Sequence, residues 1–182
     1  MLGDRQNRDG LYDARTVANF IIALHASRGE KLTQLRLYKL LYFCHGWFLV
    51  EFGKPLVWNA FEAWERGPVI KAVRDCFRKF GANPITEFAA VFDFRSGQIS
   101  EFSHSLNEAH ERFVTTVVDG YRGISAGQLS EMTHGTGSPW DHLWRAGQPI
   151  GRFGLRMKNH EILTDFLDIA PDARLGYNPH PL

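Results

Sequence analysis

The sequence predicts a mainly α-helical domain of the α+β class, with one buried central helix and a small antiparallel sheet of about three strands. Residues 33–55 form the densest apolar block of the chain. They leave no wide polar stripe, so a helix there must be buried on nearly all sides. Other segments repeat apolar residues at helical spacing. Two stretches, around Phe61 and between Phe88 and Phe102, have the residue types and partial alternation of strands.

The central helix has marked ends. Thr33 is a suitable N-cap, because its hydroxyl can accept a hydrogen bond from a free backbone N–H. Gly53 suits the left-handed position that follows a helix, and Pro55 prevents continuation. A membrane span is disfavoured, because it needs about 20 mostly apolar residues and ionisable side chains interrupt this run. These side chains are Arg36, Lys39, His45 and Glu51.

The other helices are predicted from their caps and apolar stripes. The first runs from the cap Asp13 to about Arg28. The third begins at Gly67-Pro68, because proline is tolerated in the first helical turn, and stops at Gly81. Three capping signals open further helices, and a last helix spans about residues 159–169. The signals are Ser105 with Glu108, Ser125 with Gln128, and Ser138 before Pro139.

A β-hairpin is expected between residues 88 and 102, where two apolar stretches flank Arg95-Ser96-Gly97. A short strand near Phe61 is expected to join it. Together these segments give the sheet of about three strands.

Length and composition indicate one domain. The 182 residues can bury a sufficient core, and the net charge of +1 with a pI near 7.9 provides no bulk attraction to nucleic acid or acidic lipid. Two cysteines are too few for a disulfide framework, and no secretory signal is visible, so we expect a reducing cytoplasm. Residues 1–11 are expected to be a flexible lead-in, 12–170 the domain and 171–182 a disordered tail.

The histidines are the first candidates for chemistry. His134 and His142 flank a GTGSPW turn and could converge, but the ligand spacing of a metal site is missing, so a loop hydrogen bond is favoured. The pair His110-Glu111 is not a metalloprotease motif, because Val114 stands where the second histidine should be. Cys44 next to His45 is interpreted as a buried structural cysteine rather than half of a catalytic dyad.

Residues 135–138, Gly-Thr-Gly-Ser, precede a helix and could bind an anion through backbone N–H groups. They lack the length and the lysine of a P-loop. A plain loop with Ser138 as N-cap explains the same residues and is favoured.

A basic stripe on the third helix is the strongest exposed charge feature. It contains Lys71, Arg74 and Arg78, with Arg66 and Lys79 nearby, and Asp75 is expected to pair with Lys79. The stripe is either a solvated helix face or a contact surface for an acidic protein or a nucleic-acid backbone. No aromatic residues alternate with it to stack bases, which weakens a single-strand role.

Several motifs resemble one protein family. They are YDARTVANF at 12–20, LTQLRLYKLLYFCHGWFL at 32–49, GKPL at 53–56, FEAWERGPVI at 61–70 and LSEMTHGTGSPW at 129–140. In this order they resemble the SocA-type antitoxins, also called Panacea-domain or phage-associated GepA-like proteins. The resemblance covers about residues 12–165, and the KLLYF-x-x-G-W block followed by EAW-x-x-GPV is specific.

The resemblance implies a non-enzymatic antitoxin of a bacterial type II toxin–antitoxin module, often carried on phage or mobile elements. Its partner would be a toxin from an adjacent gene, and the family's founding member further implies an adaptor role toward the ClpXP protease. No cofactor or metal is implied. We expect the partner surface at the third helix and the loop after Met132. Its residues would be Arg66, Lys71, Arg74, Arg78, His134 and Asp141.

Two other functions stay open on the residues alone. One is a nucleic-acid-binding regulator that uses the basic face of the third helix, although the chain has no net basic charge to support it. The other is an unrecognised enzyme with His134, Asp141 or His142 in its active site, beside a helix N-terminus.

Overall fold

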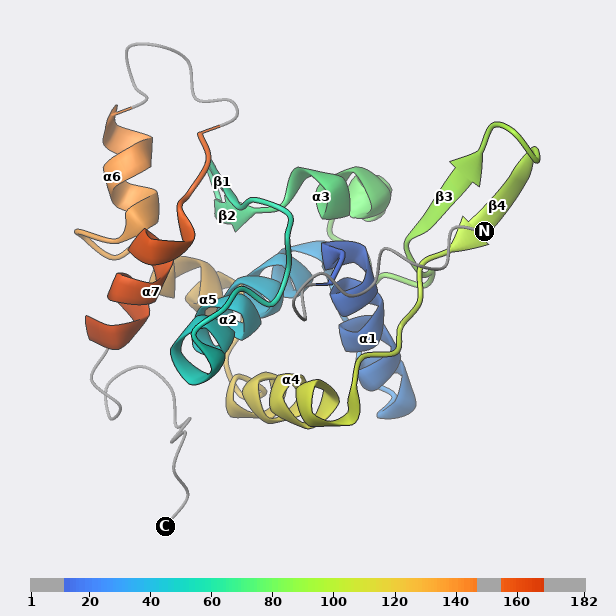
Figure 1. The fold of residues 1–182 in the computed structure, drawn as a ribbon, viewed down its shortest axis with the longest axis horizontal. Helices are drawn as coiled ribbons and strands as arrows, with labels where there is room; N and C mark the ends of the chain where they lie inside the picture. Colours follow the sequence, from blue (N-terminus) through green and yellow to red (C-terminus); the bar gives the residue numbers. More distant parts are fainter. Residues whose placement is uncertain (1–11, 147–154, 169–182) are drawn as a thin grey trace.

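A long central helix, α2 (Gln34–Phe52), lies in the middle of the fold with the other helices around it (Figure 1). The computed structural model describes residues 12–146 and 155–168, and the predicted lead-in and tail lie outside this part of the chain. The helices in the described ranges are α1 (Ala14–Ser27), α3 (Lys71–Phe77), the 3-10 helix η1 (Arg78–Phe80), α4 (Glu108–Gly120), α5 (Ala126–Met132), α6 (Pro139–Ala146) and α7 (Asn159–Asp168). The predicted mainly helical α+β class is confirmed.

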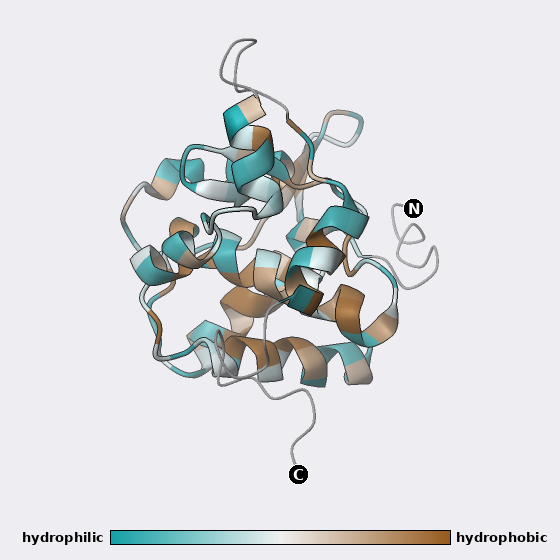
Figure 2. Cartoon of the chain, turned by 90° about the vertical axis from the view of Figure 1, so that its left-hand side faces the viewer, coloured by the Kyte–Doolittle hydropathy of each residue, from teal (hydrophilic) through white to brown (hydrophobic). Residues whose placement is uncertain are grey.

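Helix α2 is buried because the other elements cover it on several sides. Every residue from Leu37 to Leu49 is buried, and α1, α4, α5, α7 and the strand β2 (Gly67–Val69) all contact this helix. Figure 2 shows the apolar helices at the centre and polar segments toward the outside. The predicted ends are confirmed, since Thr33 accepts a hydrogen bond from the Arg36 N–H and Gly53 has a φ of 64°.

The last helix, α7, packs closely across α2. Gly46 permits this approach, because a Cβ atom at that position would lie 2.3 Å from the ring of Phe166. Ile162 and Phe166 are fully buried at the contact. Asn159 adds a polar contact, with 3.1 Å between its Oδ1 and His45 Nε2. Residues far apart in the sequence therefore complete the core.

The strands form two separate antiparallel pairs. Strand β1 (Glu62–Trp64) pairs with β2, and β3 (Ala90–Asp93) pairs with β4 (Gln98–Glu101). The predicted hairpin is confirmed, but the strand near Phe61 does not join it. The prediction that a helix begins at Gly67-Pro68 is wrong: these residues form β2, and α3 begins at Lys71. A proline that suits a first helical turn also suits a short edge strand.

Local capping signals were mostly correct. Asp13 accepts a hydrogen bond from the Arg15 N–H, and Ser125 with Gln128 forms a complete capping box. Ser138 caps α6 through the Asp141 N–H. The predicted Ser105 cap is wrong, because Asn107 caps α4.

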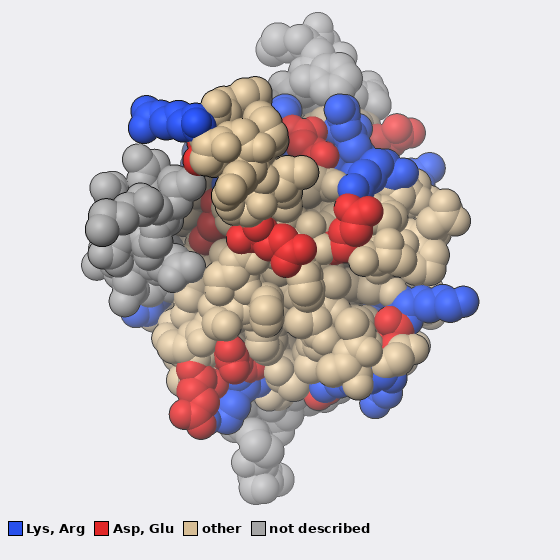
Figure 3. All heavy atoms as spheres, turned by 90° about the vertical axis from the view of Figure 1, so that its right-hand side faces the viewer, with Lys and Arg blue, Asp and Glu red and all other residues tan. Residues whose placement is uncertain are grey.

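The β3–β4 hairpin projects away from the helices at the right of Figure 1. Its base is fixed by the buried Asn19, whose amide nitrogen donates to the carbonyls of Ala89 (3.2 Å) and Phe102 (2.9 Å). The Asn19 Oδ1 accepts from the Ala89 N–H at 2.7 Å. Near the tip, Phe94 and Ile99 are exposed by 90% and 73%. Figure 3 faces this side, where a largely uncharged lobe projects and charged side chains lie around it.

No helix in the described part of the chain is long and apolar enough to cross a membrane.

Candidate functional site

A lysine is buried in the middle of the central helix. Lys39 has no exposed surface, and its Nζ donates to the carbonyl of Arg66 and to Thr133 Oγ1, the latter at 3.1 Å. Helix α2 supplies Lys39, the turn after β1 and the first residue of β2 supply Arg66 and Gly67, and the segment directly after α5 supplies Thr133 and His134. We call these five residues the Lys39 cluster. It joins three segments that lie far apart in the sequence.

The cluster holds its cation without an acidic partner. Burial lowers the pKa of Lys39 to about 7, because the charged form loses its hydration. Among the described residues its ammonium is hydrogen-bonded only to a carbonyl and a hydroxyl, with no carboxylate. Burial and the nearby Lys39 also lower the pKa of His134, whose Nε2 is buried without a hydrogen-bond partner. Burial therefore shifts both side chains toward their neutral forms.

Gly67 makes room for the cluster. It has a φ of 97°, and a Cβ atom there would lie 1.9 Å from Lys39 Nζ and 3.1 Å from His134 Nε2. A side chain at this position would collide with the lysine and strain the backbone. Position 67 therefore requires glycine for two reasons, the positive φ and the lack of space for a side chain.

Two tryptophans connect the cluster to the surface. The Trp140 Nε1–H donates to the carbonyl of Trp64 at 2.7 Å, which ties α6 to β1. The His134 ring lies 3.9 Å from the Trp140 ring, centroid to centroid. On the other side, the guanidinium of Arg74 lies 4.5 Å from the Trp64 ring centroid. The structure therefore brings two predicted contact residues, Arg74 and His134, against these tryptophans.

The predicted basic stripe lies on an exposed face of α3 and η1. Lys71 forms an ion pair with Asp75 at 2.6 Å, and Lys79 pairs with Glu87, so the predicted pairing of Asp75 with Lys79 is wrong. Arg78 is exposed and forms no ion pair within the described residues. Part of the stripe is thus neutralised within the chain.

The polar groups of the predicted 134–142 loop serve its fold. Asp141 Oδ2 accepts from the Gly137 N–H at 3.1 Å, and its Oδ1 pairs with Arg145 at 2.6 Å. The Arg145 contact lowers the pKa of Asp141, with a further contribution from the Gly137 N–H. In the described residues no hydrogen bond joins His134, Asp141 and His142. Instead, His142 lines a groove of about 450 Å³ between α6 and α7.

The other candidates for chemistry also have structural surroundings. Cys44 is fully buried in α2, and burial raises the pKa of its thiol, as expected for a structural cysteine. His45 is buried beside it, and burial lowers its pKa to about 4. Within the described residues, no three His, Cys, Asp or Glu side chains gather where a metal ion could bind.

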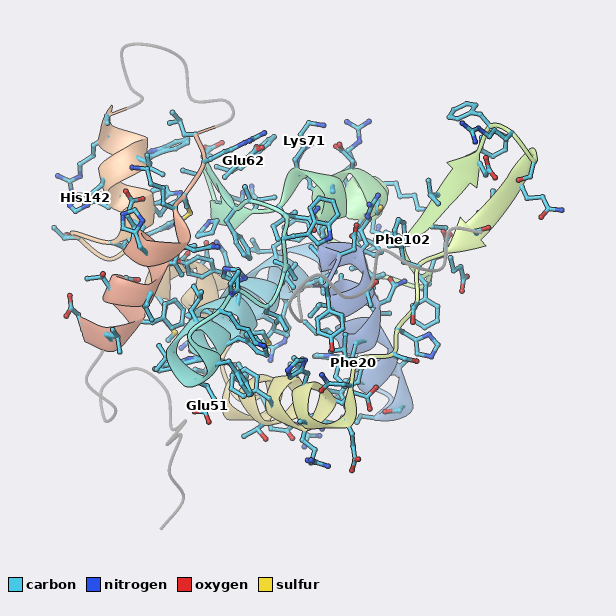
Figure 4. The ribbon with its side chains drawn as sticks, viewed as in Figure 1. Phe20, Glu51, Glu62, Lys71, Phe102 and His142 are labelled. Carbon is cyan, nitrogen blue, oxygen red and sulfur yellow. The ribbon has the colours of Figure 1, made fainter. Side chains whose placement is uncertain are left out.

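A second groove, of about 730 Å³, lies beside the basic stripe. We call it the α3 groove. Its lining includes Trp58, Glu62, Ile70, Lys71 and Arg156, from the segment before β1, from β1 and α3, and from the segment before α7. Figure 4 shows Glu62 and Lys71 along the upper edge of the molecule, with His142 apart from them at the left. Trp58, 57% exposed, stands at this groove.

Lys39, Gly67 and Trp58 were not identified as site residues from the sequence. A signal existed for Lys39, because an ionisable residue in a helix that must be buried on all sides needs a buried partner. Gly67 was interpreted as a helix start. Trp58 has no sequence signal, because its exposure depends on how its loop lies against α3.

Comparison with known proteins shows similarity to one family. The family model described as "Antitoxin SocA-like, Panacea domain" matches residues 37–141. A curated protein of Caulobacter vibrioides (strain NA1000 / CB15N), named "Antitoxin SocA", is 38% identical over 150 residues, which are 80% of this chain and 77% of that protein. No solved structure matches.

Proposed function

The chain belongs to the family of SocA-like antitoxins with a Panacea domain, and on this basis we propose that it neutralises a partner toxin by binding it directly. The observation that carries the proposal is the match to an antitoxin along four-fifths of the chain. A match of this extent includes α2, the β1–β2 turn and the α5–α6 loop, which together form the scaffold.

The arrangement of the polar groups supports binding rather than catalysis. Lys39 and Thr133 are buried, and the polar groups of Asp141 are occupied by Gly137 and Arg145. A catalytic group needs access to a substrate and a partner within hydrogen-bond reach. The exposed features, by contrast, are a groove, a projecting hairpin and a basic stripe, which suit contact with a macromolecule.

We assign the partner as a toxin encoded by the neighbouring gene of a type II module, with both proteins in the cytoplasm. The test is expression of the neighbouring gene alone and together with this protein. We expect growth arrest in the first case and rescue in the second, with a complex that co-purifies at defined stoichiometry. A neighbouring product that is harmless alone, or toxic in the presence of this protein, would falsify the proposal.

Delivery of the toxin to ClpXP is a second part of the proposal. The half-life of purified toxin is measured with ClpXP and ATP, with and without this protein. If the protein acts as an adaptor, the toxin should be degraded rapidly only when ClpXP with ATP and this protein are present together. A toxin that stays intact in the bound state would mean that neutralisation occurs by occupancy alone.

DNA binding through α3 has weaker support. Lys71 is paired with Asp75, and Arg74 lies against Trp64, so few cations of the stripe are available for phosphates. Phosphate contacts are strongest at low salt. DNA binding would gain support if the protein bound the module's own promoter at low ionic strength and an Arg74→Glu/Arg78→Glu variant did not.

A further inference from the structure

The α3 groove differs from the rest of the surface in combining an exposed indole with a basic margin. Its volume of about 730 Å³ lies in the range of ligand pockets, about 300–1,000 Å³. Trp58 is 57% exposed at one side, and the apolar Ile70 and Ala72 contribute to the lining. Large exposed aromatic side chains in such positions are frequent anchors of protein interfaces.

We propose that the α3 groove binds a segment of the partner toxin that carries carboxylate side chains beside at least one large apolar residue. This inference rests on the proposed function, since it names the surface and the chemistry through which the toxin is held.

The charges at the groove indicate an acidic occupant. Its two carboxylates already have partners in the chain, because Asp75 is paired with Lys71 at 2.6 Å and Glu62 accepts from the Trp64 Nε1–H at 3.1 Å. Arg156, in contrast, is exposed and forms no ion pair within the described residues. Arg156 thus offers a guanidinium that a carboxylate can bind in bidentate fashion.

The basic stripe extends this charge beyond the groove. Arg78 lies in η1, directly after the helix that forms one wall, and the exposed Arg66 is in the turn after β1. Neither forms an ion pair within the described residues, whereas Arg74 lies 3.7 Å from Asp75 and over the Trp64 ring. Charges of this kind at an interface margin mainly speed association of an oppositely charged partner. The groove would hold the apolar residue of the toxin, and the stripe would attract its acidic neighbours.

A protein segment fits these features better than a nucleic acid. The lining is partly apolar and of mixed charge, with Ile70 and Ala72 beside Glu62 and Asp75, whereas a phosphate backbone is bound through several Lys and Arg side chains. In the described structure, Trp58 is the only exposed aromatic among the lining residues, whereas single-strand binding uses several stacking platforms.

The experiment measures the affinity of the purified toxin for wild-type protein and for Trp58→Ala and Arg156→Glu variants. The matched controls are Phe94→Ala, an exposed aromatic on the hairpin, and Lys31→Glu, an exposed cation outside the groove. We expect Trp58→Ala to weaken binding about 30-fold or more, as for an interface anchor. Arg156→Glu should weaken it about 10-fold, with the larger effect at low salt. The affinities of the two control variants for the toxin should stay within about threefold of the wild-type affinity.

A photoactivatable side chain introduced at Trp58 identifies what occupies the groove. We expect it to cross-link one toxin segment that contains Asp or Glu beside a large apolar residue. A neutral or basic segment, or a nucleic acid in its place, overturns the proposal.

The outcomes distinguish failure of the groove as docking site from failure of the antitoxin function. If the toxin binds wild type and the Trp58→Ala variant equally, the groove is not the docking site, although the antitoxin function stands. If wild-type protein binds no product of the neighbouring gene, the proposed function fails and the groove assignment fails with it. Circular dichroism of each variant must match wild type, because both side chains are exposed and their replacement should leave the fold intact.

Discussion

At the scale of single residues, the unusual feature is a lysine in the centre of the core. Within the described part of the chain, the Lys39 ammonium group has a carbonyl and a hydroxyl as its hydrogen-bond acceptors, and both groups also bind elsewhere. The Arg66 carbonyl accepts from Ser130, and the Thr133 hydroxyl donates to the Ser130 carbonyl. Removing the lysine would therefore leave no group without a partner. A sequence alone could flag the residue, but it could not name partners that lie on two other segments.

Replacing Lys39 with Met should keep or raise the free energy of unfolding at pH 7. Well-packed apolar replacements of buried charges are neutral or stabilising by about 1–4 kcal/mol. In the wild type, the pKa is about 7 in the folded state and 10.5 when unfolded, so stability rises with pH between these values. Urea denaturation from pH 7 to 9 should show this rise in the wild type and a smaller one in the variant.

Lys31→Met, at an exposed position, is the control and should leave the pH dependence unchanged. A Lys39→Met protein that is several kcal/mol less stable at pH 7 would show that the ammonium contributes favourable energy.

Gly67→Ala should be strongly destabilising. A positive φ costs a non-glycine residue about 1–3 kcal/mol, and the new methyl group would also collide with Lys39. We expect a total loss of more than about 2 kcal/mol in thermal or chemical unfolding. Gly123→Ala meets no atom within 4 Å and serves as the comparison. Equal stability of the two variants would argue against the close approach of Lys39 to Gly67.

At the scale of elements, the sequence predicted what depends on neighbouring residues and missed what depends on distant ones. The caps Asp13, Thr33 and Ser125 were correct because each acts within one helical turn. The role of Gly67-Pro68 was wrong, because only pairing with β1 distinguishes a strand from a helix start there. The same limit applies to the α3 groove, whose lining comes from segments between residues 15 and 156.

Gly46→Ala should weaken the packing of α7 on α2. The added methyl group would lie 2.3 Å from the Phe166 ring, and overpacking of this kind costs about 1–3 kcal/mol. Combining it with Phe166→Leu, which frees space, should recover part of the loss. Gly127→Ala, in helix α5 with its nearest neighbour at 3.9 Å, should be neutral or slightly stabilising in the same denaturation assay. A harmless Gly46→Ala would contradict the close crossing.

Asn19→Ala should release the base of the β3–β4 hairpin. It leaves the buried N–H of Ala89 without its acceptor, with an expected loss of about 1–3 kcal/mol. Hydrogen exchange of the Ala89 amide should accelerate far more than that of the α2 core. Asn83→Ala, at an exposed position without a side-chain hydrogen bond among the described contacts, should change neither quantity. Retained protection at Ala89 would mean that the hairpin is held by other contacts.

At the scale of the whole molecule, the buried ionisable groups act together on stability. Burial lowers the pKa of His25, His45, His110 and His134, so each favours its neutral form in the folded protein. In the unfolded chain these groups bind protons below about pH 6.5. The unfolded state then binds more protons than the folded state, and acid favours unfolding.

We therefore expect the free energy of unfolding to fall as the pH decreases from about 6.5 toward 4. The largest single share should come from His45, with its folded pKa of about 4. Urea titrations at pH 5, 6, 7 and 8 test this, and His45→Gln, which can keep a hydrogen bond to Asn159, should flatten the curve. Equal stability at pH 5 and 7 would contradict the buried, neutral state of these histidines.

The contact between α2 and α7 has a consequence during synthesis on the ribosome. Helix α2 is complete at Phe52, but α7, which covers part of it, begins only at Asn159. At about 5–20 residues per second, roughly 100 intervening residues take on the order of 5–20 s to translate. Throughout that interval the apolar surface meant for Phe166 is open to chaperones and proteases. The nascent chain therefore keeps this part of α2 uncovered until α7 emerges.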